Sequence, residues 1–429
     1  MINLNSKVMR RVLLLIGLLF IVVGQAMAQN STCASASNKN TLYCVPVLAI
    51  QDLGTSTTVV PSTPPAFSAL DSAIAIQLSN VPTPSPAAGI VFSFGSNGLT
   101  RERELGPIFS EAPPTVGRHR LYLAFTYQFM EFDEMDGVSL KRIPLQFTTP
   151  GCFGNPGCTS NIITVSRLDF KVNQFTAYAT YGLFNRFDLS VAVPILQVRM
   201  GMQTTCTVCS QAQPDGTVLT FSPNFTAGDS TGIGDVTFRA KATVLKGSRA
   251  GLALGVDVRA PSGNALNFLG SGAIGVRPFV AFGYRARVSP HADVAYHYNG
   301  NSILAASTQS NTAPLPHLLD YSAGLDFGIR RSLSVTGDFL GQTFFNADRV
   351  FSVSHNSFSG GPSSPDISCN PNPQVLTCQS QTFNTKTLAI GGKINPAGNL
   401  LISANVLIKL DHIGLHYRPA PMIGISYTF

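Results

Sequence analysis

Apolar and polar residues alternate along the stretch from Gly232 to Tyr298. Between residues 235 and 244, the even positions are apolar and the odd positions carry polar or charged side chains, including Arg239 and Lys241. Side chains alternate faces along a strand, so this run predicts a strand with one apolar and one charged face. A soluble sandwich would bury the apolar face, whereas a membrane barrel turns it to lipid and turns the polar face to a lumen. The same alternation returns after each turn, over residues 252–259, 274–287 and 291–299.

Strand-like alternation continues from Arg118 to the C-terminus and predicts about twelve strands, with fourteen as the alternative. Short turns and long connections alternate between these strands without exception. Bacterial barrels have an even number of strands, short periplasmic turns and longer outer loops. We therefore predict an all-β, transmembrane, antiparallel up-and-down β-barrel over residues 118–429. The expected short turns lie near residues 182–186, 246–250, 288–290, 330–332 and 395–399.

The chain before the barrel divides into two parts. Residues 1–28 have a basic start, an apolar run from Val12 to Val23 and a small-residue cleavage site at Ala26–Ala28, which together predict a signal peptide. Residues 29–117 are Pro-rich and predict one short helix over Phe67–Leu78 and a strand over Val91–Phe94. This second part is interpreted either as a periplasmic-side plug of the barrel or as a flexible lead-in.

The composition excludes several classes of protein. Charged residues make up 12% of the chain, against about 25% in soluble proteins. After the leader, no run approaches the roughly 18 apolar residues of a transmembrane helix, so a helical membrane protein is excluded. Without the three basic residues of the leader, the net charge falls from +7 to +4, which is too small to predict a nucleic-acid partner. The chain has no Trp, so its 11 Tyr and 28 Phe must form the interfacial girdles of the barrel.

The eight cysteines fall into local pairs in the exported part of the chain. Local pairs in an exported protein predict disulfides within loops. Cys206 and Cys209 also have the C-x-x-C spacing of metal and redox sites, but a zinc site would need a second pair of ligands. The expected disulfides are Cys33–Cys44, Cys152–Cys158, Cys206–Cys209 and Cys369–Cys378.

The charged face of the strands is the best candidate for a solute path. An Arg that faces lipid at the membrane midplane costs about 2–4 kcal/mol, so these charges must point into the lumen. The turn at 246–250 should bring Arg239 near Asp257, and the turn at 288–290 should bring Arg285 near Asp293. We expect a net positive wall, which either steers anions or is stiffened by pairing across strands. The candidates are Arg239, Lys241, Asp257, Arg259, Arg277, Arg285, Asp293 and His297.

Neither a catalytic site nor a cofactor is predicted. The chain has no Gly-x-Ser-x-Gly nucleophile motif, and no candidate triad stands out. His412 and His416 have a spacing that could bind a metal on a helix, but Gly414 lies between them in a predicted loop. His291, Asp293 and His297 share the lumen face, where hydrogen-bonded residues are a commoner interpretation than a metal or proton site.

The last strand ends with aromatic and aliphatic residues at alternate positions up to Phe429. This pattern is similar to the C-terminal signature by which assembly machinery recognises outer-membrane barrels. We therefore expect three partners: the barrel-assembly machinery, the lipid of the bacterial outer membrane and a small-molecule solute.

Five segments resemble the outer-membrane transporter family named after the meta-cleavage pathway of phenol degradation. The resemblance covers about residues 120–345 and implies a barrel that passes hydrophobic or aromatic compounds. We expect a channel or transporter for small solutes of this kind. A structural or adhesive barrel acting through disulfide-braced outer loops is the alternative, and a barrel enzyme comes third. The segments are Tyr181–Pro194, Gly232–Lys241, Arg259–Gly263, Gly270–Phe279 and Ser289–Asp293.

Overall fold

The computed structural model describes most of the predicted barrel and five parts of the chain before it. Residues 1–28, the predicted signal peptide, lie outside the described residues, as do residues 29–39 and 52–72. In the part of the chain described, no helix is long and apolar enough to cross a membrane. The described residues are 40–51, 73–86, 92–95, 98–101, 106–152, 155–208, 211–212, 218–219, 223–305, 312–330, 332–353 and 375–429.

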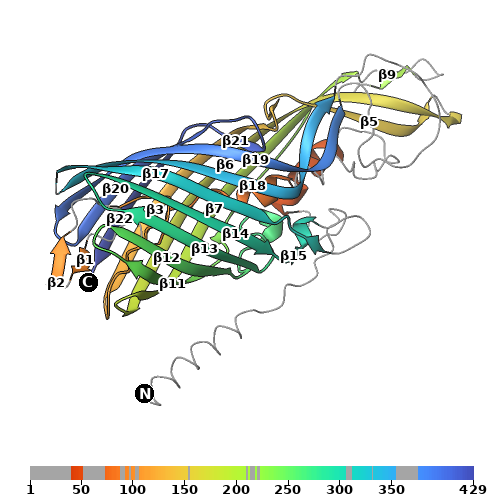
Figure 1. Ribbon diagram of the computed structural model, residues 1–429. Coiled ribbons are helices and arrows are strands. Elements are labelled where there is room, and N and C mark those ends of the chain that lie inside the picture. Colours follow the sequence, from red (N-terminus) through yellow and green to blue (C-terminus); the bar gives the residue numbers. More distant parts are fainter. Residues whose placement is uncertain are drawn as a thin grey trace.

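Twelve antiparallel strands form a closed barrel (Figure 1). The last strand pairs with the first, with Ile425 opposite Phe125, so the sheet closes on itself. The predicted fold class is confirmed. In order around the barrel, the strands are β3 (Leu121–Met135), β6 (Asn155–Phe184), β7 (Phe187–Val208), β11 (Thr237–Lys246), β12 (Ala250–Arg259), β13 (Gly275–Tyr284), β14 (Val288–Asn299), β17 (Leu318–Arg330), β18 (Leu333–Val353), β19 (Val375–Ala397), β20 (Leu400–Lys409) and β22 (Ala420–Thr428).

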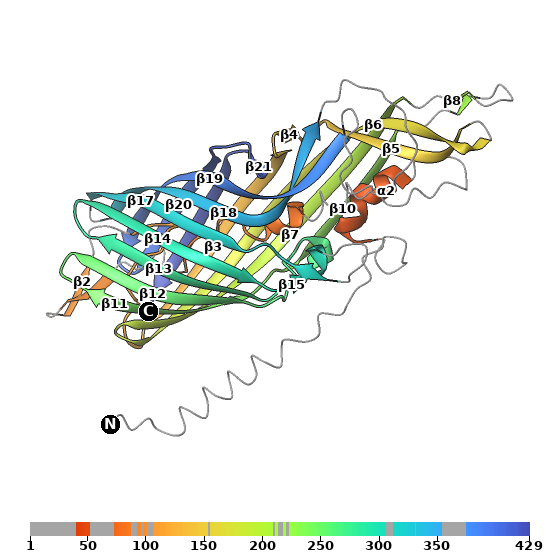
Figure 2. The same cartoon turned by 45° about the vertical axis from the view of Figure 1, so that its right-hand side comes forward.

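Long strands extend one side of the barrel beyond its outer end (Figure 2). β5 (Ile143–Cys152) pairs with β6, and β10 (Asn224–Ile233) pairs with the outer half of β7. β4 (Val138–Ser139) and β21 (Leu415–Tyr417) pair with β3. The remaining elements are η1 (Leu42–Cys44), α2 (Val45–Gln51), β1 (Phe92–Gly95), β2 (Gly98–Arg101), β8 (Gln211–Ala212), β9 (Val218–Leu219), η2 (Ala265–Asn267), β15 (Asn301–Ser302), η3 (Ile303–Ala305) and β16 (Ala313–Pro314).

The two faces of the barrel wall are inverted relative to a soluble protein. Large apolar side chains are exposed on the outside, including Leu254 and Phe282, each 44% exposed. Charged side chains are buried on the inside, including Arg239 at 8% and Lys241 at 2%. This arrangement suits lipid outside and a polar lumen inside, and it places the barrel in the bacterial outer membrane.

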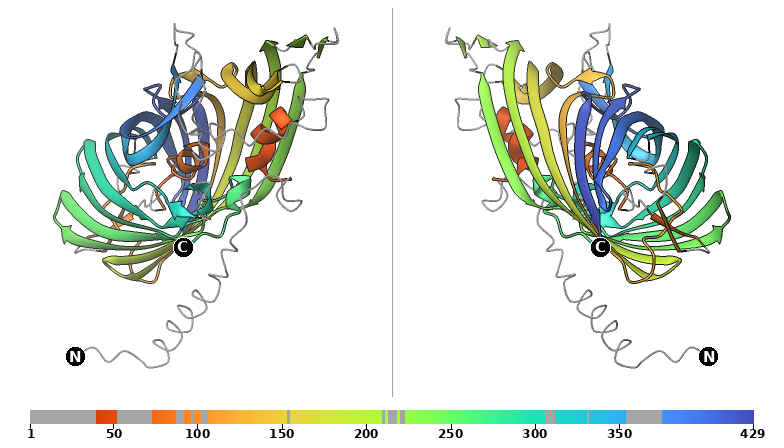
Figure 3. Two further views of the ribbon diagram at one scale, coloured as in Figure 1. Left: turned by 90° about the vertical axis from the view of Figure 1, so that its right-hand side faces the viewer. Right: turned by 90° about the vertical axis from the view of Figure 1, so that its left-hand side faces the viewer.

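Most of the described N-terminal segment lies inside the barrel, whereas β1 and β2 lie at its periplasmic end (Figure 1). Viewed along the barrel in Figure 3, the helical residues 73–78 lie within the ring of strands, and α2 lies against β7 and β10. The expected helix is present over its last part, where Ile74 and Leu78 are buried. The expected strand near residues 91–94 is present as β1, which pairs with β2.

Two local expectations were wrong. The turn expected at residues 288–290 lies at 285–287, because Val288 and Pro290 already pair with β17. The lumen register is shifted accordingly, and Asp293 lies opposite Ala281 rather than near Arg285. Pro194 and Pro278 lie within predicted strands, where each removes a ladder donor, so the sequence predicts a bulge at both. Pro278, however, lies in an unshifted register opposite Val256.

The other strand proline, Pro194, does lie at an irregularity. β7 pairs with β10 as far as Ile195 opposite Ile233, and with β11 from Ala192 opposite Thr237. Two residues of β7 therefore face the three residues 234–236, which is the geometry of a bulge.

Candidate functional site

Residues 106–116, called the strap below, cross the lumen near the periplasmic turns. At the β19 side, the Nζ of Lys393 donates to the carbonyl oxygens of Gly106 and Pro107, both at 2.7 Å. The Oγ of Ser110 donates to Asp338 of β18 at 3.2 Å. Further along the strap, Lys241, Thr243 and Asp188 bind the backbone of Ala112, Pro113, Pro114 and Val116. Charged and polar lumen side chains thus hold the strap along its length.

A second N-terminal piece, residues 73–86, runs along the lumen from the outer end toward the strap. At its outer end, the Nη1 of Arg259 donates to the carbonyl oxygen of Ser79 at 3.4 Å. At its inner end, the Oγ1 of Thr180 donates to the carbonyl oxygen of Pro86 at 3.3 Å. The backbone N–H of Ser85 donates to Ile108 of the strap at 3.0 Å, which joins the two pieces.

A cavity of about 270 Å³, called the chamber below, lies between these N-terminal pieces and the barrel wall. An engineered apolar cavity of about 150 Å³ is enough to hold benzene, so the chamber has room for a single substituted ring. Part of its lining is apolar and part is charged. The apolar lining includes Leu78, Phe109, Leu196, Phe268, Leu269 and Leu340.

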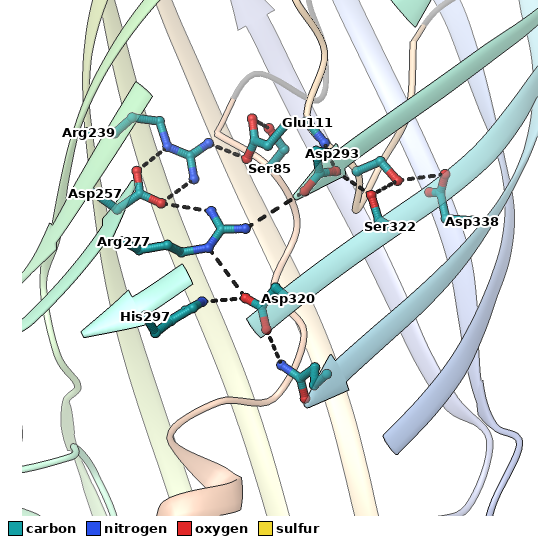
Figure 4. Close-up of polar contacts among 12 residues, drawn as sticks. Ser85, Glu111, Arg239, Asp257, Arg277, Asp293, His297, Asp320, Ser322 and Asp338 are labelled. Atoms are coloured by element: carbon teal, nitrogen blue, oxygen red, sulfur yellow. Dashed lines mark hydrogen bonds and ion pairs between the residues drawn. The ribbon is translucent and has the colours of Figure 1, made fainter. Parts of the chain in front are cut away.

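Two arginines, on the strands that flank β12, organise the charged part of the chamber (Figure 4). Arg239 binds both oxygens of Asp257 at 2.6 and 2.7 Å and also binds Glu111 of the strap. The Nη1 of Arg277 contacts the same Asp257 at 3.0 Å. Both guanidinium groups lie over the ring of Phe279, at 4.9 and 5.6 Å from its centre. Bidentate pairing and the aromatic face fix these planar groups in position.

Arg277 extends the network to the next two strands of the wall, β14 and β17 (Figure 4). Its Nε lies 3.4 Å from Asp320 and its Nη2 lies 3.9 Å from Asp293. His297 also contacts Asp320. Asp293 in turn accepts the backbone N–H of Glu111 at 2.8 Å. A single connected network therefore joins the wall to the strap.

A loop fastened by Asp235 closes the outer side of the chamber. Asp235 accepts hydrogen bonds from the backbone N–H of Gly263 at 3.1 Å and from the N–H and Oγ of Ser271 at 2.7 and 2.5 Å. Arg259 lies 3.8 Å away from this carboxylate. The loop, residues 260–271, includes η2 and buries Phe268 and Leu269. It lies beside the bulge between β10 and β11.

The charges of the chamber do not make the net positive wall that we expected. Its acidic side chains outnumber its arginines, because the strap contributes Glu111 and the segment between β10 and β11 contributes Asp235. Each arginine also has at least one acidic neighbour. The acids are Glu111, Asp235, Asp257, Asp293 and Asp320, against Arg239, Arg259 and Arg277, with His297 beside them.

Six of the eight predicted site residues line the chamber, namely Arg239, Asp257, Arg259, Arg277, Asp293 and His297. Arg239 and Asp257 pair as predicted. Lys241 instead binds the strap, and Arg285 lies at a periplasmic turn, where its N–H donates to Arg249 at 2.8 Å.

Sequence reasoning missed two members of the network. Asp320 was missed because the alternation in the sequence predicts a strand that starts at Tyr321, whereas β17 already begins at Leu318. No periodic signal marks Glu111, which lies in a Pro-rich stretch outside the strands.

The predicted disulfides are described only in part. Cys44 is disulfide-bonded, and the side chains of Cys33, Cys152, Cys158, Cys206, Cys209, Cys369 and Cys378 lie outside the described residues. Within the part of the chain described, no cluster of three His, Cys, Asp or Glu residues could hold a metal ion. His412 and His416 instead contact Glu134 and Asp133, each at 2.6 Å.

The closed barrel, its apolar outer face and its charged lumen define an outer-membrane β-barrel whose lumen is crossed by its own N-terminal segment. Residues 164–363 match the family model described as "Putative MetA-pathway of phenol degradation". The family resemblance seen in the sequence is therefore confirmed over this range. No curated protein matches the sequence.

Solved structures with similar barrels share little sequence with this chain. An outer-membrane channel from Pseudomonas putida F1 is 12% identical, with 74% of this chain and 98% of that chain covered and a TM-score of 0.42. A FadL homologue from Pseudomonas aeruginosa is 10% identical, with 81% of this chain and 98% of that chain covered and a TM-score of 0.31. A channel named CymD, for monoaromatic hydrocarbons, is 8% identical, with 73% of this chain and 88% of that chain covered and a TM-score of 0.30.

Proposed function

We propose that this protein conducts small, neutral, aromatic or otherwise apolar solutes across the outer membrane through the chamber. The observation that carries the proposal is the chamber itself, a cavity of about 270 Å³ inside the barrel, bounded by the strap and by residues 73–86. Its mixed lining offers an apolar side for a ring and polar groups for a hydroxyl, as small-molecule sites commonly do. The match to a phenol-degradation family supports aromatic solutes.

The charges favour neutral solutes over anions. The acids of the chamber outnumber its arginines, and Arg239 and Arg277 are already engaged by carboxylates. An anion would therefore meet a negative field and few free basic partners. A phenol should thus be accepted in preference to a benzoate of similar size.

Passage requires the strap to move, because it crosses the lumen near the periplasmic end. Its hydrogen bonds are made mostly to side chains of the wall rather than to a strand edge. Such contacts can be released without breaking the barrel ladder. We expect the strap to act as the periplasmic gate.

The binding step is tested with the refolded mature chain, by titrating phenol and benzoate calorimetrically. Phenol should bind more tightly than benzoate, and Leu196→Trp should abolish binding by filling the chamber. Leu189→Trp is the matched control, because Leu189 is 43% exposed on the lipid face of the same strand. Equal binding by both Trp variants and the wild type would refute the chamber as the site.

The transport step is tested by single-channel recording in a planar bilayer, with and without residues 29–117. Removal of the segment should raise conductance. A folded barrel that stays silent in both forms would exclude a channel and would favour a structural or adhesive role of the outer loops.

A further inference from the structure

A row of charged side chains crosses the outside of the barrel where β3, β6, β7 and β10 leave the membrane. The register places Glu131 opposite Lys171, Lys171 opposite Arg199, and Arg199 opposite Asp229. Lys171, Arg199 and Asp229 are exposed. The proposed transport path does not use this row, since that path lies on the inner face of the same strands.

The position of the row relative to the membrane follows from the residues on its periplasmic side. Four positions toward the periplasm, the same strands carry Tyr127, Phe175, Ile195 and Ile233 on the same face. Phe175 is 50% exposed, Ile195 44% and Ile233 54%, as expected for side chains in contact with lipid tails. Four residues of strand rise about 13 Å, less when the strand is tilted. The long connections mark this end as the outer one, so the row lies at the headgroups of the outer leaflet.

A hollow of about 630 Å³ opens in the wall beside the row. It exists because Gly201 and Ala227, which are direct partners on β7 and β10, carry almost no side chain. Four basic side chains line it, together with three acids. The basic residues are Lys141, Arg167, Lys171 and Arg199, and the acids are Glu131, Asp169 and Asp229.

The two basic side chains at the centre of the row make no ion pair within the described part of the chain, although an acid lies opposite each of them on the next strand. Arg167 pairs with Asp169 at 3.5 Å, and Glu131 pairs with Arg418 at 3.2 Å. Among the described residues, no ion pair engages Lys171 or Arg199, although they are direct cross-strand neighbours. Like charges directly opposite each other destabilise a sheet, and an anion held between them would remove the repulsion.

From this geometry we infer that the hollow binds a phosphate-bearing headgroup of an outer-leaflet lipid. Lys171 and Arg199 would contact the phosphate by charge-assisted hydrogen bonds. The acyl chains would then lie over Phe175, Ile195 and Ile233, directly below the hollow. A lipid satisfies both features at once, whereas a free phosphate uses only the charges.

The test is a titration of the refolded barrel in detergent with bis-phosphorylated lipid A, followed by native mass spectrometry. Lys171→Gln with Arg199→Gln should weaken binding about thirtyfold, at about 1 kcal/mol for each basic residue. The matched control is Arg249→Gln with Arg287→Gln, the same charge change at exposed periplasmic turns, and it should bind like the wild type. Heat-modifiable gel mobility establishes that each variant is folded.

Three outcomes would overturn the inference. An equal loss in the control pair would mean that overall charge, rather than the hollow, attracts the lipid. Unchanged affinity for lipid A stripped of its phosphates would mean that the apolar side chains below the hollow bind the lipid and the basic residues do not. Inorganic phosphate that competes as strongly as the lipid would show a free-anion site rather than a headgroup site.

Discussion

Glu111→Gln should loosen the strap without disturbing the barrel. Glu111 is the strap residue that Arg239 binds, and its second oxygen accepts the Oγ of Ser85 at 2.9 Å. Removing one partner of a buried ion pair costs about 3–5 kcal/mol when the other charge is left alone. Here Arg239 keeps Asp257 at 2.6 and 2.7 Å, so the cost is smaller.

The expected loss is the difference between charge-assisted and neutral hydrogen bonds at two contacts. That difference is about 2–3 kcal/mol in total, which corresponds to a roughly 30- to 150-fold shift toward the open strap. Hydrogen exchange measures this shift directly, because local opening exposes the backbone N–H groups of the strap. The amides of residues 106–116 should lose protection by that factor, while the amides of the barrel strands keep theirs.

The matched control is Glu131→Gln, which removes the same charge from a partly exposed rim pair with Arg418 at 3.2 Å. Surface pairs contribute about 0–1 kcal/mol, so the protection of the strap should hardly change in this variant. Protection of the strap that is the same in Glu111→Gln, Glu131→Gln and the wild type would refute the idea that the Arg239 contact holds the gate closed.

Three further predictions concern the outer loop, the lipid face and assembly. Asp235→Ala should speed exchange of the loop 260–271 by about tenfold or more, because three charge-assisted hydrogen bonds are lost; unchanged exchange would exclude Asp235 as the fastener. Val280→Arg should destabilise the barrel in urea titrations by about 2–4 kcal/mol, and Val288→Arg near the periplasmic turn by no more than about 1 kcal/mol; equal losses would contradict the assigned membrane level. Phe429→Ala should reduce the heat-modifiable barrel found in the outer membrane of cells, and an undiminished yield would argue against recognition through Phe429.

Much of the barrel could be derived from the sequence because the signal is local. The alternation of apolar and polar residues has a period of two, and it assigns each residue to the lipid or the lumen without knowledge of its neighbours in space. The pairing of Arg239 with Asp257 also followed from sequence, since one short turn joins their strands. The same reasoning failed for Asp293, because an error of a few residues in the position of the next turn changes every partner along the strand.

The sequence by itself determined the strands, the inverted faces and the alternation of short turns with long loops, since all three depend on neighbouring residues along the chain. The chamber was decided only by the tertiary structure. Glu111 is 128 residues from Arg239, and no sequence pattern predicts their contact. The strap is held largely through its backbone carbonyl groups, which every residue possesses and no sequence pattern can mark. The net charge of the chamber likewise depended on the acids that the strap and the segment between β10 and β11 placed beside the arginines.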